Sequence, residues 1–365
     1  QLASVAASWL GRRGRLSAPQ LRLLVACGAA AGIASAYNAP IAGSFFVAEI
    51  ILGTIAMESL GPLAVAAVAA TLTIRTLSDA HTLYAVPSFT MHSLWEIGPF
   101  IMLGLIAGTV APIFLRSLRT VEGWFARTQL PLPVRLMLGG LIVGALAVWV
   151  PEVCGNGYSV VVTILNGQLI WTTLVLVLVC KWIATAASFG SGAPGGVFTP
   201  TLFMGASLGY LFGFSVNMVW PAGASDPRAF ALVGMGALLA AASHAPVMAI
   251  IMLFEMTLSY DIIMPLMLCS VIAYYTARGF EERSLYSESL KRKTAAAQIR
   301  KANISRVNRA TKSRADVNCW VKCPDVIRGG IAAGLGENIS VKWRLSVFKV
   351  GLVFRTPCET KSARR

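Results

Sequence analysis

Apolar stretches follow one another along most of the chain, and charged residues are rare between them until about residue 280. Several of these stretches are shorter than the roughly 20 residues that a helix needs to cross a bilayer, and many end at Gly or Pro. The pattern therefore predicts an all-α integral membrane protein with broken, tilted helices. The helices are expected at 21–36, 41–57, 60–77, 98–115, 134–150, 159–187, 201–219, 229–243, 246–258 and 262–278.

The sharpest interruption of the pattern is the run Gly190–Pro200, with the sequence GSGAPGGVFTP. Four glycines and two prolines in eleven residues do not continue a helix. Inside a bilayer, backbone without helical hydrogen bonds is tolerated only where protein buries it or it lines a polar cavity. The run is therefore expected to place a helix N-terminus, with free N–H groups and a positive dipole end, inside the protein. Such an N-terminus is a site for an anion.

An internal repeat is visible when the chain is shifted by 206 residues, because Gly28–Glu49 then aligns with Gly234–Glu255 without a gap. Seven of the 22 positions are identical, and they include Pro40 with Pro246 and the two glutamates. Short segments interrupted by Pro at matching positions are typical of transporters built from repeats. The repeat predicts two related halves.

Composition supports a membrane protein, because 56% of the residues are hydrophobic and 13% are charged, with a mean hydropathy of +0.68. Soluble domains carry about 25% charged residues. The net charge is +15, and residues 281–365 hold 19 of the 31 Lys and Arg. We expect a transmembrane domain at 1–290 and a basic cytoplasmic tail without assigned structure at 291–365. A basic tail beside a membrane domain indicates anionic lipid as its neighbour, not nucleic acid.

Basic residues cluster at 12–22 and 116–135, and the segment 78–97 contains no Lys or Arg. We expect two cytoplasmic loops and one external loop there. The seven cysteines indicate no disulfide framework, and the C-x3-C pair Cys319 and Cys323 has no His beyond it in the chain. We predict no metal site, and no cluster of catalytic residue types indicates an enzyme.

Five motifs resemble those of the CLC family of chloride channels and chloride/proton antiporters. The first, at 191–200, resembles the family's G-x-F-x-P signature with its usual flank. The others are YNAPIAG at 37–43, GMGA at 234–237, EMT at 255–257 and SLY at 284–286. The resemblance covers roughly residues 1–290. It implies an inverted-repeat CLC-type fold and a homodimer in the lipid bilayer, with chloride as the substrate and no cofactor.

The resemblance also implies the ligands of the ion. The backbone N–H groups of Val197 and Phe198, next to Gly196, and the hydroxyl of Tyr286 are expected to contact chloride. Neutral donors and helix dipoles offset the desolvation of an anion without trapping it as a full positive charge would. The glutamate that gates the outer end of the pore in this family would precede Gln1.

Two neighbouring residues bear on proton coupling. Ile50 stands at the position of the inner proton-relay glutamate of the family's antiporters, and Glu49 is its neighbour. An isoleucine carries no proton, so passive conduction is favoured, with coupling through water as the alternative. Glu49 itself is either a proton-path group or a structural acid paired with Glu255.

We therefore predict transport of chloride or a similar small anion through a pore in each subunit, as in a voltage-gated chloride channel. A chloride/proton antiporter is the alternative, and a structural membrane protein without transport is a remote one. The expected location is the bacterial inner membrane, as a multi-pass protein.

Overall fold

The structure of the chain, a computed structural model, describes residues 2–77, 84, 94–168, 170–193, 195–220 and 225–281. Within these ranges the regular structure is helical and contains no strand, which confirms the predicted all-α class. Seven described helices are long and apolar enough to cross a membrane. They are α2 (Ala18–Tyr37), α4 (Met57–Leu77), α5 (Ile97–Arg127), α6 (Leu132–Trp149), α8 (Trp171–Ser191), α9 (Phe198–Val219) and α12 (Ile263–Phe280).

The remaining described elements are shorter. They are α1 (Leu2–Arg13), α3 (Pro40–Phe46), the π-helix η1 (Val47–Leu52), α7 (Tyr158–Leu165), α10 (Pro227–Ser243), α11 (Pro246–Thr257) and the 3-10 turns η2 (Leu94–Glu96) and η3 (Pro151–Val153). The chain divides into two compact units, Gln1–Ala295 and Ala296–Arg365, and all described residues belong to the first. The tail predicted at 291–365 lies outside the described residues.

Several predicted segments differ from the structure. The helix expected at 41–57 ends at Leu52, and the loop expected at 12–22 is shorter, because α1 ends at Arg13 and α2 begins at Ala18. The expected helix at 159–187 is two helices, α7 and α8, because Asn166 and Gly167 end α7, with Gly167 at a positive φ of 69°. The expected basic loop at 116–135 is mainly helix. Arg116, Arg119 and Arg127 all belong to α5, which continues well past its apolar part.

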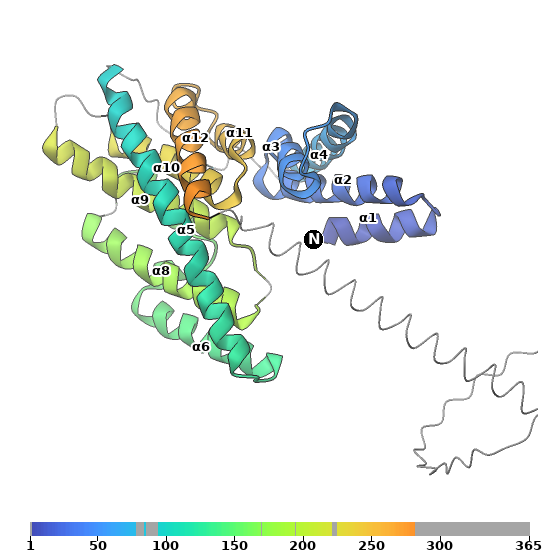
Figure 1. Cartoon of the computed structure of the whole chain (residues 1–365), viewed down its shortest axis with the longest axis horizontal. Coiled ribbons are helices and arrows are strands. Elements are labelled where there is room, and N and C mark those ends of the chain that lie inside the picture. The colour runs from blue at the N-terminus through green and yellow to red at the C-terminus, as the bar shows by residue number, and fades with distance from the viewer. Residues whose placement is uncertain are drawn as a thin grey trace, which may run out of the picture. The chain divides into compact units, whose positions relative to one another are not determined.

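The long α5 runs beside α8, α10 and α12 (Figure 1). Aromatic contacts fix its position along its length. Phe100 stacks on Phe230 of α10, with ring centroids 4.4 Å apart, and Phe114 meets Trp182 of α8 edge to face at 5.4 Å. The indole N–H of Trp182 also donates a hydrogen bond of 2.9 Å to the hydroxyl of Ser117. These contacts hold α8, which leads into the glycine run.

Helices α9 and α10 approach each other more closely than any side chain would allow. A Cβ added at Gly209 would lie 2.1 Å from the carbonyl oxygen of Phe230, and one at Gly205 would lie 2.5 Å from that of Gly234. Small residues at such crossings let helix backbones touch in membranes. Most of α10 is buried, so it forms the centre against which α9 is fixed.

The two copies of the repeat have the same backbone at their break. Asn38 and His244 both end a helix in the left-handed region, with φ, ψ of 52°, 34° and 58°, 34°. Ala39 and Ala245 follow with φ of −129° and −134°, and a proline then opens the next helix. The repeat predicted from the sequence is therefore a repeat in structure.

Candidate functional site

The glycine run joins the end of α8 to the start of α9, as predicted. Helix α8 ends at Ser191, where Gly192 adopts a φ of 87° and donates to the carbonyl of Phe189 at 3.1 Å. Helix α9 begins at Phe198, a few residues before the predicted start at residue 201. Pro200 fits in this first turn because its missing N–H needs no helical partner there.

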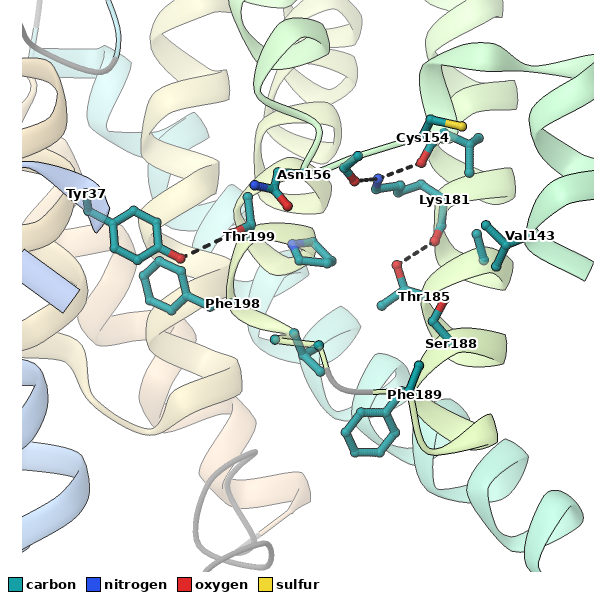
Figure 2. A pocket seen from close by; sticks show the side chains of 18 residues that line it. Tyr37, Val143, Cys154, Asn156, Lys181, Thr185, Ser188, Phe189, Phe198 and Thr199 are labelled. Atoms are coloured by element: carbon teal, nitrogen blue, oxygen red, sulfur yellow. Dashed lines mark hydrogen bonds between the residues drawn. The ribbon is translucent and has the colours of Figure 1, made fainter. Parts of the chain in front are cut away.

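A cavity of about 590 Å³ lies between α8 and the start of α9 (Figure 2). Gly195, Gly196, Val197 and Phe198 border it on one side. Helix α8 borders it on the other side, where Lys181, Thr185, Ser188 and Phe189 are labelled in the figure. The anion motif, by which we mean the predicted anion-binding residues Gly196–Phe198, therefore faces a neighbouring transmembrane helix across the cavity.

The backbone at this cavity has donors without acceptors. In the part of the chain that the structure describes, the amides of Val197 and Phe198 donate to no protein oxygen. The carbonyl of Val197 is already used, because it accepts from the amide of Thr201 at 3.0 Å and from its hydroxyl at 2.8 Å. The first turn of α9 contains no acidic residue. Its N-terminus is thus open to an anion.

The glycines beside these amides have free space around them. A Cβ added at Gly195 or Gly196 would meet no protein atom within 4 Å, and neither residue has a positive φ. The fold therefore does not require glycine at either position, since there is room for a side chain and the backbone is not left-handed. A glycine in such a place lets a ligand approach the backbone closely.

Residues from the first repeat cover the motif. The rings of Tyr37 and Phe198 have centroids 4.9 Å apart, and Phe46 meets Phe198 edge to face at 6.1 Å. The hydroxyls of Tyr37 and Thr199 form a hydrogen bond of 3.2 Å (Figure 2). The N-terminal half of the described chain thereby fixes the first residues of α9.

Lys181 of α8 is a cavity residue that the sequence analysis did not single out. Its side chain is 4% exposed, and its ammonium donates to the carbonyls of Val153 at 2.7 Å and Gly155 at 2.8 Å. It is the one charged side chain among the described residues that line the cavity. A lysine inside an otherwise apolar span was the available signal, because such residues are rare and mark ion pathways.

Glu49 and Ile50, two other predicted site residues, do not line this cavity. Glu49 and Ile50 lie together in η1, and Glu49 accepts a hydrogen bond of 2.8 Å from the amide of Met248. Ile50 packs against the hydrophobic core. Tyr286 lies outside the described residues, as do Cys319 and Cys323.

The last described residues tie α12 to α5. Glu281 forms ion pairs of 3.2 Å with both Arg116 and Arg119, and Arg116 also donates to the carbonyl of Phe280 at 2.7 Å. Burial alone would raise the pKa of Glu281. The hydrogen bonds from the two arginines outweigh burial, so its pKa lies below the ordinary value.

Comparison with known proteins identifies relatives along most of the chain. The family model described as voltage gated chloride channel matches residues 1–278. A chloride channel protein of Ralstonia nicotianae described as ClcB-like is 53% identical over 296 residues, which are 80% of this chain and 69% of that protein. The voltage-gated ClC-type chloride channel ClcB of Citrobacter koseri is 43% identical over 289 residues, which are 79% of this chain and 69% of the relative.

Solved structures share the fold. A slow cyanobacterial Cl⁻/H⁺ antiporter superposes with a TM-score of 0.74 at 29% identity, over 81% of this chain and 70% of that one. A CLC-type fluoride/proton antiporter superposes with a TM-score of 0.68 at 23% identity, over 78% and 69% of the two chains. The second likeness concerns the fold alone.

Proposed function

Because the chain belongs to the voltage gated chloride channel family, we propose that it carries chloride across the membrane through the cavity beside Val197 and Phe198. The observation that carries the proposal is the pair of backbone amides at this cavity that have no acceptor in the described protein. This function is that of a transporter, not of an enzyme. Chloride is the substrate, and the proposal needs no cofactor.

The physical chemistry of the cavity suits a halide that must bind and leave. A small anion pays a large cost when it is removed from water. Two N–H groups at a helix N-terminus, helped by the helix dipole, offset part of this cost with neutral donors. Conduction requires binding that is strong enough to admit the ion and weak enough to release it. From its sequence motif, the hydroxyl of Tyr286 is proposed as a further donor.

Lys181 complements these donors from the other side of the cavity. Its ammonium is already hydrogen-bonded to two carbonyls, so it contributes mainly a positive potential to the cavity. A buried charge is costly unless an opposite charge is near. Within the described residues, no carboxylate lines the cavity with it. We propose that the transported anion supplies part of the missing negative charge.

The spans and the bacterial relatives make the chain a multi-pass integral membrane protein of the bacterial inner membrane. We further propose a homodimer with one pore in each subunit. The family resemblance supports this assembly. Apolar side chains exposed on the spans, such as Val65 of α4 and Met264 of α12, are suited to lipid or to a second subunit.

A chloride channel and a chloride/proton antiporter remain two candidate functions. Ile50 at the relay position favours the channel, since its side chain exchanges no proton. The likeness to the cyanobacterial Cl⁻/H⁺ antiporter favours the antiporter. The protein in liposomes loaded with chloride separates them when anion efflux and external pH are recorded together. Chloride efflux without pH change supports the channel, and efflux with stoichiometric proton uptake supports the antiporter. Absence of chloride efflux in this experiment would reject transport.

A further inference from the structure

Helices α3 and α11 each receive a carboxylate from the other at the N-terminus. The carboxylate of Glu255, near the end of α11, accepts from the amides of Ile41 at 3.0 Å and Ala42 at 2.7 Å in the first turn of α3. The carboxylate of Glu49, in the continuation of α3, accepts from the amide of Met248 in the first turn of α11. The two contacts are therefore reciprocal.

The reciprocity follows from the repeat. Each glutamate lies nine residues after the proline that opens its own helix, Pro40 or Pro246. Since α3 and α11 pack against each other, a carboxylate at the end of each helix reaches the beginning of the other only if the two run antiparallel. The two glutamates thus link α3 to α11, which are about 200 residues apart in sequence, at both ends of the helix pair.

The carboxylates satisfy amides that have no partner within their own helices. The first amides of a helix have no partner within the helix, and in an apolar region an unsatisfied amide is costly. An anionic side chain there is also favoured by the helix dipole. The N-terminus of α9 has no such carboxylate among the described residues. Side-chain carboxylates thus cap the N-termini of α3 and α11, whereas the N-terminus of α9 is open at the cavity.

The helix that Glu255 holds carries one of the two rings that cover the first residues of α9, and it closely follows the other. Tyr37 precedes α3 by a few residues, and Phe46 is its last residue. Both rings touch Phe198, and Tyr37 also bonds to Thr199. A shift of α3 would therefore move Phe46 directly and would displace Tyr37 through the short link between α2 and α3.

We propose that Glu49 and Glu255 act as positioning residues, a reciprocal clamp that joins the two repeats and holds Tyr37 and Phe46 against the anion site. The part of the proposal that concerns anion affinity rests on the proposed function of the cavity. The joining of α3 and α11 does not. In this account Glu49 acts through its hydrogen bonds and not as a carrier of transported protons.

The test compares Glu49→Gln and Glu255→Gln, each alone and both together, with Glu58→Gln as the matched control. Glu58 is an exposed glutamate in the first turn of α4, so its replacement removes a charge but no cap of α3 or α11. Chloride binding is measured by calorimetry on the detergent-purified protein. A ¹⁹F label in 3-fluorotyrosine at position 37 reports its contact with Phe198, with Phe198→Leu as the reference for a lost contact.

We expect each single variant to bind chloride about tenfold more weakly, which is the factor for about 1.4 kcal/mol and the scale of a helix cap. The ¹⁹F resonance should move toward that of Phe198→Leu in each variant and stay in place in Glu58→Gln. The double variant should lose less than the product of the two single factors, because both caps fix the same helix pair. Glu255→Asp keeps the charge and should recover part of the loss.

The outcomes separate the two proposals. If the parent binds no chloride but its ¹⁹F resonance still moves in Glu255→Gln, the proposed function fails and the clamp stands. If a folded Glu255→Gln keeps both the parental resonance and the parental affinity, the clamp is wrong. It is also wrong if Glu49→Gln removes only proton uptake and leaves anion binding and the resonance unchanged. If Glu255→Gln does not fold, Glu255→Asp supplies the same comparison.

Discussion

Replacing Gly196 with Ala is expected to leave the protein at least as stable as the parent and to weaken its binding of chloride. The added Cβ would meet no protein atom within 4 Å, and the backbone of Gly196 lies outside the left-handed region. Substitution of Gly by Ala at a compatible position stabilises proteins by about 0.4–1 kcal/mol, since the unfolded chain loses freedom. The unfolding midpoint should therefore stay or rise.

The loss of binding follows from where the methyl group would stand. It would enter the cavity next to the amides of Val197 and Phe198. A hydrogen bond to a charged partner contributes about 1.5–3 kcal/mol. If the methyl group keeps the anion from one of the two amides, affinity falls about 10- to 100-fold, since 1.4 kcal/mol is tenfold. Stability and binding should thus change in opposite directions.

Gly140→Ala is the matched control, because Gly140 is an exposed residue of α6 whose added Cβ would also meet no atom within 4 Å. It should raise stability, as Ala favours a helix over Gly by about 1 kcal/mol, and leave binding unchanged. The assays are thermal unfolding in detergent and chloride calorimetry. Parental affinity in Gly196→Ala would show that no anion binds beside Gly196. A large loss of stability would also refute it, because the glycine would then serve the fold.

Three further substitutions test other parts of the structure. Gly209→Ala should lower the free energy of unfolding by about 1–3 kcal/mol, because its Cβ would meet the backbone of Phe230, and parental stability would contradict the tight α9–α10 contact. Lys181→Met should cost about 1–3 kcal/mol for each of the two carbonyls left unpaired and should slow chloride flux, whereas Lys181→Arg should keep it. Equal flux in the parent and both variants would remove Lys181 from the pathway. Glu281→Gln should flatten the acid side of the stability profile. The pKa of Glu281 in the folded protein is below the unfolded value of about 4.3. Its contribution to the free energy of unfolding is therefore present above that pH and is lost as pH falls through the folded pKa. An unchanged acid profile in unfolding measurements would contradict this.

The sequence predicted the fold well where chemistry forces a local outcome. Pro40 and Pro246 fix the start of two helices, and the matched residues before them predicted a repeat that the backbone angles confirm. The glycine run predicted the break between α8 and α9. This break could be predicted because the run lacks helix-forming residues, which is visible in the sequence itself.

Other features depend on contacts that no local pattern contains. The end of α7 is an exception, because Asn166 and Gly167, a pair typical of turns, interrupt the apolar residues on both sides and could have predicted it. Lys181 is visible as a lysine inside an apolar span, but its partners Val153 and Gly155 could not be predicted, because they lie on a turn far from it in sequence. The pairing of Glu49 with Glu255 was suggested by the repeat, but only the packing of α3 on α11 places each carboxylate at the other helix.

The proposed function depends on an anion held by the amides at the start of α9. Bromide replaces chloride in crystals of the protein and is located by its anomalous scattering. We predict a peak at hydrogen-bond distance from the backbone nitrogens of Val197 and Phe198, and a weaker peak in Gly196→Ala crystals. A cavity without a peak, with bromide bound only elsewhere on the protein, would contradict it.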